Sequence, residues 1–360
     1  MAEPIRASSP KRIAVIPGDG IGKEVIPEAV KVLKAAARVG SREILITDFD
    51  WGADRYLRDG TTLPPDAVEM FRRDYHAILL GALGDPRVPS NQQGADILIG
   101  LRFKLDLYVN ARPCVLFDER LTPLKGRTEK EINLWVIREN TEGLYAGVGG
   151  FFKKGTADEI ATQEDINTRK GVERIIRYAF DLARRQSRRR VCMSDKSNAL
   201  AYGHDLWQRV FKEIRSEYPE IEASHMYIDN LLMQMVRAPD QFEVIVTCNL
   251  FGDIASDLGA GLIGGLGLAP SGNIHPGRVS LFEPVHGSAP DIAGKNVANP
   301  IGAVLAAAMM CDYIGWGSEA RAIEAAVRAA IRENKTTVDL GGSLSTREAG
   351  DWLANRVAAA

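Results

Sequence analysis

Short apolar runs rich in Val and Ile alternate with longer amphipathic stretches along the chain. The runs are typical of strands buried on both faces. They fall at residues 12–17, 77–81, 134–138, 190–193 and 244–249. Residues 23–37 and 169–185 have the apolar spacing of helices, and residues 303–334, which follow the glycine-rich tract 259–272, are strongly helical. This alternation predicts an α/β protein with substantial parallel sheet.

The composition is that of an ordinary globular protein. Its 360 residues exceed what one hydrophobic core usually organises, so we expect two domains. A formal net charge of −2 provides no general field that would attract nucleic acid or an anionic membrane. No apolar N-terminal segment and no run of eighteen apolar residues occur, so we expect a cytoplasmic protein without a membrane span. The four cysteines lack metal-binding spacing and are expected to be reduced, buried thiols.

Two segments stand outside this alternation. The basic run RRQSRRR at residues 184–190 closes a predicted helix and precedes a predicted strand. Cations suit the negative end of a helix dipole, which favours a solvated helix end over a nucleic-acid site. Residues 147–163 contain a Gly-Gly pair and few helix formers, so they are expected to form an extended or hairpin-like arm that could pair with another subunit.

Two aspartates suggest a metal site. Asp253 and Asp257 are four residues apart at a predicted helix start and should project from one face. They repel each other unless a cation lies between them, and Mg²⁺ or Mn²⁺ takes such carboxylate ligands. An exposed acidic first turn, favoured by the helix dipole, explains the same spacing. Asp229 follows the strand-like HMYI and could complete the site, although Asp often begins a turn there. The residues alone leave both interpretations open.

Three arginines suggest an anionic ligand. In LDLYVNARP, alternation places Arg112 at the end of a strand, on the same face as Asp106 and Tyr108, and Arg138 ends the run LWVIR in the same manner. Ligands collect beyond the carboxyl ends of parallel strands, and a guanidinium matches a carboxylate bidentately. With Arg102, these residues would suit a substrate with two or more carboxylates. Surface ion pairs are the alternative for any one of them.

Polar clusters supply candidate acid, base and cofactor groups. Tyr145 in RENTEGLY and Lys196 in SDKSN are a candidate acid and base, because a neighbouring divalent cation can lower the pKa of a lysine; either could also be an ordinary loop residue. The opening GDGIG is a weak dinucleotide fingerprint, since it is not GxGxxG and no acidic residue follows at the required distance. Residues 283–299, a polar loop rich in Gly and Pro, are a stronger cofactor candidate, with an ordinary long connection as the alternative.

Taken together, the motifs resemble the β-decarboxylating dehydrogenases, the family of isopropylmalate, isocitrate, homoisocitrate and tartrate/D-malate dehydrogenases. The resemblance runs from Ile13 to about Trp352. Its motifs, in the family's order, are IPGDGIGKEV, LRFKLDLYVNARP, VIRENTEGLY, DKSN, NLFGDIASDLG and EPVHGSAPDIAGKNVANP. It implies a two-domain, mixed-sheet α/β fold that is not of the Rossmann type. Residues 1–107 with 264–360 would form the cofactor-side domain, and 108–263 an inserted dimerisation domain with its arm near 147–163.

The resemblance also implies a homodimer with shared active sites. Asp229, Asp253 and Asp257 match the ligands of Mg²⁺ or Mn²⁺, with Asp229 and Lys196 supplied by the neighbouring subunit. Lys196 would accept the hydroxyl proton, and Tyr145 would protonate the enol carbon. The implied substrate-binding residues are Arg102, Arg112, Arg138, Leu98, Ile99 and Asn198. The implied cofactor-binding residues are Ile21, Glu283, His286, Gly287, Ser288, Ala289, Asp291 and Asn299.

The same resemblance guides the expected cofactor and substrate. Asp291 stands where relatives that use NADP carry a lysine, and a carboxylate repels a 2′-phosphate, so NAD is expected. Leu98 and Ile99 lie where isopropylmalate enzymes contact the isopropyl group, and Asp96 would repel the third carboxylate of isocitrate. We therefore expect NAD-dependent oxidative decarboxylation of a 3-alkylmalate, foremost 3-isopropylmalate.

Two positions depart from the isopropylmalate pattern. Ala95 replaces a glutamate and Ala199 a valine, which suggests a wider pocket. D-malate or tartrate is therefore the second substrate expectation, followed by homoisocitrate or an unusual 3-alkylmalate. A regulatory paralogue without activity is disfavoured, because the proposed metal ligands and the acid and base are all present.

Overall fold

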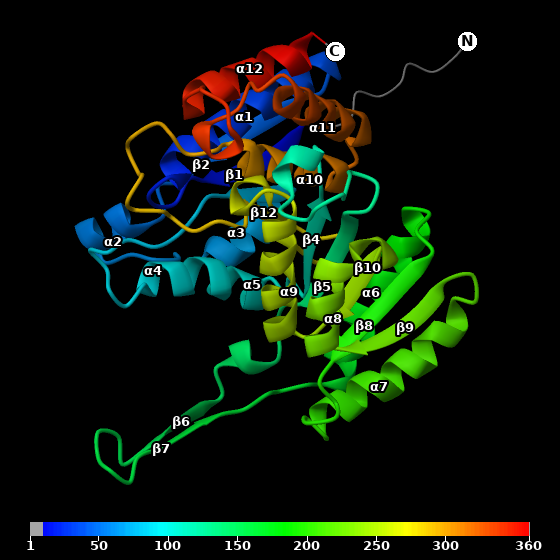
Figure 1. Ribbon diagram of the computed structural model, residues 1–360. Helices are drawn as coiled ribbons and strands as arrows, with labels where there is room; N and C mark the ends of the chain where they lie inside the picture. The colour runs from blue at the N-terminus through cyan, green and yellow to red at the C-terminus, as the bar shows by residue number, and fades with distance from the viewer. Residues whose placement is uncertain (1–9, 360) are drawn as a thin grey trace, which may run out of the picture. The chain divides into compact units, whose positions relative to one another are not determined.

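The computed structural model describes residues 10–359 and divides into two compact units (Figure 1). Unit 1 comprises the residues up to Leu105 together with those from Gly264 onward, and unit 2 comprises Asp106–Ile263. Each contains helices and a mixed sheet, which confirms the α/β prediction. Among the described residues, no helix combines the length and apolar character needed to cross a bilayer.

The sheet of unit 1 has the strand order β2-β1-β3-β12-β11. Its strands are β1 (Lys11–Ile16), β2 (Ile44–Asp48), β3 (Ala77–Leu80), β11 (Pro270–Ile274) and β12 (Ser280–Pro284). All neighbours pair in parallel except β11 and β12. The side chains of β3, β11 and β12 are buried throughout. Of the three, only β3 is a continuous apolar run, as expected of a strand covered on both faces.

The helices of unit 1 are α1 (Gly22–Val39), α2 (Ala53–Asp59), α3 (Ala67–Asp74), α4 (Gln92–Gly94), α5 (Gly100–Lys104), α10 (Ile301–Tyr313), α11 (Gly317–Arg332) and α12 (Thr346–Ala358). The helical segment predicted at 303–334 is thus two helices rather than one. Gly315 adopts a φ of +87°, a left-handed conformation that ends the first helix and lets the chain turn into the second. A π-helical turn at Ala95–Ile99 joins α4 to α5.

The sheet of unit 2 has the order β4-β5-β10-β8-β9. Its strands are β4 (Val109–Val115), β5 (Asn133–Glu139), β8 (Arg190–Asp195), β9 (Glu222–Tyr227) and β10 (Val244–Thr247). Only β4 and β5 pair antiparallel. The helices are α6 (Arg169–Arg185), α7 (Gly203–Ile214), α8 (Ile228–Arg237) and α9 (Asn249–Leu262). Helix α6 packs against α7, and α8 packs against α9.

A two-stranded hairpin extends from the rest of unit 2 (Figure 1). It consists of β6 (Gly149–Phe152) and β7 (Ile160–Gln163), which pair antiparallel. Phe151 and Phe152 are both 62% exposed, and Ile160 is 54% exposed. Large apolar side chains on so extended an element leave an unusual amount of hydrophobic surface uncovered in the single chain.

Candidate active site

Arg112 and Arg138 lie on adjacent strands of unit 2 and are both buried. In the antiparallel register of β4 and β5, Arg138 is opposite Asn110, so Arg112, two residues further along β4, shares its face. Arg138 lies near the end of its strand, as predicted. The prediction that Arg112 ends its strand is wrong, because pairing with β5 extends β4 to Val115.

The start of that strand also differs from the prediction. Asp106 and Tyr108 were expected to continue the strand alternation, but β4 begins only at Val109. Asp106 has a φ of +53°, which takes the backbone out of the extended conformation. Its carboxylate instead accepts a hydrogen bond from Arg174 at 2.9 Å.

Both arginines reach the acidic face of α9. Arg138 forms an ion pair with Asp253, and Nη1 of Arg112 lies 3.2 Å from Asp253 and 3.5 Å from Asp257. The helix begins at Asn249, so the prediction that these aspartates mark a helix start is wrong: they are its fifth and ninth residues. The field of a helix dipole is confined to the first turn, and a dipole-stabilised acidic cap therefore does not explain the pair. Burial raises the pKa of Asp257.

Asn249 and Ser256 complete this cluster, and sequence reasoning missed both. Oδ1 of Asn249 accepts hydrogen bonds from Nε and Nη2 of Arg138 at 2.9 and 2.6 Å. The hydroxyl of Ser256 accepts one from Arg112 at 2.7 Å. Their spacing was an available signal, because positions four before and three after Asp253 share its helix face.

Tyr145 joins the same cluster from the loop after β5. Its hydroxyl donates a hydrogen bond to Oδ2 of Asp253 at 2.9 Å, and the guanidinium of Arg138 lies 5.1 Å from its ring centroid. Burial and the neighbouring Asp253 carboxylate raise the pKa of Tyr145. The phenol is therefore a protonated group at neutral pH, held beside Arg138 and Asp253.

Lys196 and Asp229 form a separate pair in unit 2. Lys196 directly follows β8, and its Nζ lies 2.7 Å from Oδ1 of Asp229. This contact lowers the pKa of Asp229. Asp229 is the second residue of α8 rather than a turn residue after a strand. Asn198 is exposed in the turn that follows Lys196.

The three aspartates do not meet within one chain. Asp229 contacts Lys196, whereas Asp253 and Asp257 contact arginines. Across residues 10–359, no three His, Cys, Asp or Glu side chains are grouped in a way that could hold a metal ion. A complete three-aspartate site would therefore need side chains from two chains.

Arg102 lies in α5 of unit 1 and is buried. Its Nη2 donates a hydrogen bond to Oε1 of Glu283 at 3.0 Å, and the same oxygen accepts one from Asn273 at 2.8 Å. The Nε of Arg102 is buried and has no hydrogen-bond partner among the described residues. A buried donor without a partner carries a desolvation cost that a bound carboxylate would remove. Oε1 of Glu283 is thus bonded within the protein, and the expected role of Glu283 in cofactor binding stays a prediction.

The GDGIG loop packs tightly against the loop that contains Ser288. The amide of Ile21 donates a hydrogen bond to the carbonyl of Ser288 at 2.9 Å. Gly20 has a φ of +52°, and a Cβ there would lie 2.1 Å from that carbonyl. The carboxylate of Asp19 is fully buried and accepts hydrogen bonds from the amides of Ala53 and Gly84. The glycines thus serve the close approach of two loops.

The remaining predicted cofactor residues line the loop after β12. Burial lowers the pKa of His286, whose Nε2 is buried without a partner in the described part of the chain. Asn299 donates a hydrogen bond to Asp339 and accepts one from the amide of Ile301. Gly287 and Asp291 are exposed, Ser288 is buried and Ala289 is half-buried.

Leu98 and Ile99 lie half-buried in the π-helical turn of unit 1. Such turns frequently occur at functional sites. In the same turn, Asp96 accepts hydrogen bonds from Thr62 at 2.7 Å and from Gln92 at 2.8 Å. These contacts fix the orientation of its carboxylate.

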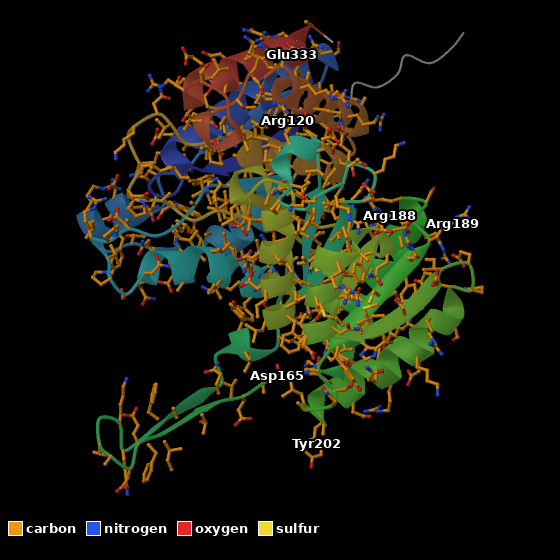
Figure 2. All side chains as sticks on the ribbon, viewed as in Figure 1. Arg120, Asp165, Arg188, Arg189, Tyr202 and Glu333 are labelled. Carbon is orange, nitrogen blue, oxygen red and sulfur yellow. The ribbon has the colours of Figure 1, made fainter. Side chains whose placement is uncertain are left out.

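The basic run at 184–190 is largely engaged within unit 2. Arg188 and Arg189 lie where β8 begins (Figure 2). Arg188 donates hydrogen bonds to the carbonyls of Asn133 and Glu243, and burial lowers its pKa. Arg184 pairs with Glu220. These contacts favour a structural role for the run.

Comparisons with known proteins match most of the chain. The family model described as isocitrate/isopropylmalate dehydrogenase matches residues 12–353. The 3-isopropylmalate dehydrogenase of Thermobifida fusca is 47% identical over 96% of this chain and 98% of its own length. That of Frankia casuarinae is 45% identical over 96% and 99%. The crystal structure of isocitrate dehydrogenase from Methylococcus capsulatus aligns with a TM-score of 0.87 and 41% identity, over 97% of this chain and 99% of that one. These matches confirm the resemblance inferred from the motifs.

Proposed function

Since this chain belongs to the isocitrate/isopropylmalate dehydrogenase family, we propose that it catalyses the NAD-dependent oxidative decarboxylation of 3-isopropylmalate. The curated relatives named above carry the name of that activity and are about as long as this chain. The reaction removes hydride from C2 of a 2-hydroxy diacid and then releases the neighbouring carboxylate as CO₂. A cytoplasmic location suits it, and the four free, buried cysteines are consistent with a reducing compartment.

The observation that carries this proposal is the pairing of two buried arginines with two aspartates on α9. Arg112 and Arg138 supply guanidinium groups for the carboxylates of a diacid. Asp253 and Asp257 supply hard oxygen donors, and their side chains are 33% and 57% exposed, so they are accessible to an ion. This donor set fits Mg²⁺ or Mn²⁺. When bound, such an ion supplies Lewis-acid stabilisation of the oxygen at C2 as negative charge develops there.

We place the complete site in a homodimer. Lys196 and Asp229 contact each other but none of the α9 cluster, so a second chain would bring this pair to the other's Asp253 and Asp257. Two exposed features support such an assembly. One is the apolar β6–β7 hairpin, and the other is Tyr202, which is 93% exposed at the start of α7 (Figure 2).

Different side chains bind the substrate, accept its hydroxyl proton and return a proton to the product. Arg112 and Arg138 hold the carboxylates and orient C2. Lys196 accepts the proton of the C2 hydroxyl as hydride leaves for the nicotinamide. Tyr145, kept protonated by its raised pKa, donates a proton to the carbon that has lost CO₂. One proton is thus taken up and one returned.

The loop after β12 fits NAD. The buried, unpartnered Nε2 of His286 offers a polar contact to a bound ligand. The carboxylate of Asp291 is exposed and can accept hydrogen bonds from ribose hydroxyls, while it repels a 2′-phosphate. Ile21, Gly287, Ser288, Ala289 and Asn299 complete the proposed adenosine contacts.

Substrate choice rests on the π-helical turn. Leu98 and Ile99 offer apolar surface for an alkyl group. The oriented carboxylate of Asp96 disfavours a third carboxylate, as in isocitrate. Ala95, in the same turn, leaves room for other substituents, and D-malate or tartrate is the alternative substrate.

The test measures NADH formation with 3-isopropylmalate, D-malate, D-tartrate, isocitrate and homoisocitrate, each with Mg²⁺ or Mn²⁺. We expect the highest kcat/KM with 3-isopropylmalate. Asp253→Asn should abolish turnover, whereas Asp205→Asn, which removes an exposed carboxylate on α7, should not. A far higher kcat/KM with D-malate would contradict the substrate, and no NADH from any of the five would contradict the reaction.

A further inference from the structure

A pocket lies in unit 1, at the end of the sheet where the parallel strands begin. It has a volume of about 570 Å³, within the range of small-molecule sites. Lys11 is the first residue of β1, and His76 and Val279 directly precede β3 and β12. The proposed cofactor residues follow the other ends of these strands, so the length of the sheet separates the two places.

The pocket is strongly cationic. Lys11, Arg72 and Arg278 line it together with His76, and none of the described residues that line it is acidic. Within residues 10–359, the ammonium of Lys11 and the guanidinium of Arg278 have no side-chain partner. Arg72 does have partners, Glu69 at 2.7 Å and the carbonyl of Lys104 at 2.6 Å. The pocket therefore holds two uncompensated positive charges beside a third, partly neutralised one.

Two tyrosines give the pocket firm aromatic walls. Tyr75 packs edge-on against Phe49 and Phe71, with ring centroids 5.8 and 5.7 Å away. The hydroxyl of Tyr313 donates hydrogen bonds to the carbonyls of His275 and Arg278, which ties its ring to the β11–β12 turn. Rings held in this way offer flat apolar surface to a planar ligand at little entropic cost.

His76 offers a hydrogen-bond donor to an anion in this pocket, although its imidazole is uncharged. Its Nδ1 accepts a hydrogen bond from the amide of Arg12 at 3.1 Å. Burial and then the nearby charges of Lys11 and Arg12 lower its pKa. A neutral imidazole with Nδ1 as acceptor carries its proton on Nε2, so it is a further hydrogen-bond donor.

We propose that this pocket binds a nucleoside phosphate, with the phosphates between Lys11 and Arg278 and the base against the tyrosines. Cations alone would suit any anion, but adjoining aromatic walls favour one that also carries a planar ring. The site is distinct from the one that would bind NAD. Its occupancy would tie the β11–β12 turn to the end of α3, two elements of unit 1 that are far apart in sequence.

The test is calorimetric titration of the full-length protein with ADP, in the presence and absence of saturating NADH. We expect ADP to bind in both conditions. Lys11→Gln and Arg278→Gln, made singly, should each weaken binding roughly tenfold, the usual value of one charge-assisted contact. Lys34→Gln, which removes an exposed cation on α1, should leave it unchanged. Thermal unfolding of each variant verifies that it is folded.

Three outcomes would overturn the proposal. They are absence of ADP binding when NADH is present, unchanged affinity in both pocket variants, and equal affinity for pyrophosphate and ADP. The last would leave no role for the tyrosines. Titration without NADH keeps this test independent of the proposed dehydrogenase activity. If the protein does not bind NADH, a loss of ADP affinity in the Lys11 and Arg278 variants still assigns ADP binding to this pocket.

Discussion

The main-chain amide of Lys196 donates a hydrogen bond to Nδ1 of His204, with the two nitrogens 2.8 Å apart. The imidazole is 1% exposed, and because Nδ1 is the acceptor, the proton of the neutral ring lies on Nε2. That nitrogen faces a carboxylate oxygen of Asp165, 3.6 Å away, at the base of the hairpin (Figure 2). A buried histidine thus fixes the turn that carries the proposed catalytic base.

His204→Leu should therefore lower kcat by about 10- to 100-fold, as removal of a positioning contact commonly does. His204→Asn should recover most of the activity, because its amide oxygen can accept the same hydrogen bond as Nδ1. The measurement is steady-state kinetics of both variants, with thermal unfolding as a control for folding. Equal losses in the two variants would show that His204 contributes packing only.

Strands β1, β3, β5, β8 and β10 could be predicted from sequence, because burial on both faces leaves continuous apolar runs. Strand β11, with the sequence PSGNI, has no such run and was not predicted. The predicted helix at 169–185 has the bounds of α6. The position of Arg112 within its strand could not be predicted from sequence, since it depends on antiparallel pairing with a strand more than twenty residues away. The spacing of Asn249 and Asp253 places both on one helix face, but the contact of Asn249 with Arg138 spans 111 residues and could not be predicted from local sequence. The break between α10 and α11, by contrast, could have been predicted, because the Gly-Trp-Gly sequence at 315–317 is a local turn signal.

The β6–β7 hairpin should hold the proposed dimer together. Replacing Phe151 and Phe152 with serine removes two apolar side chains that are 62% exposed in the single chain. Because buried aromatic anchors dominate interfaces, we expect dissociation to become easier by roughly 100-fold or more. Sedimentation velocity over a range of concentrations measures this change.

Activity should fall in parallel with dimer dissociation, since the proposed site takes Lys196 and Asp229 from the second chain. Ala157→Ser, an exposed change in the loop of the same hairpin, is the matched control and should remain dimeric. A fully active monomer of the Phe151 and Phe152 variant would refute the shared site.

Asp291 should set the preference for NAD over NADP. Asp291→Lys combined with Ile292→Tyr exchanges an exposed carboxylate for groups that can bind a 2′-phosphate. We expect the ratio of kcat/KM for NADP to that for NAD to rise about tenfold or more, the effect of one charge-assisted contact. Glu333→Lys, an equal change of charge at the end of α11, should leave the ratio unchanged (Figure 2).

Asp85 should make unit 1 sensitive to acid. Its carboxylate accepts hydrogen bonds from Nε and Nη2 of Arg87 at 2.9 and 2.6 Å, which lower its pKa to about 2. A carboxyl whose pKa is lower in the folded state stabilises that state above its ordinary pKa of 3.8, and loses this effect as the pH falls toward 2. Asp85→Asn should therefore lower Tm by roughly 1 to 3 °C at pH 7, a small effect because Arg87 is exposed. The difference from the unmodified protein should narrow below about pH 4, whereas one that is constant down to pH 3 would exclude ionisation of Asp85 as its cause.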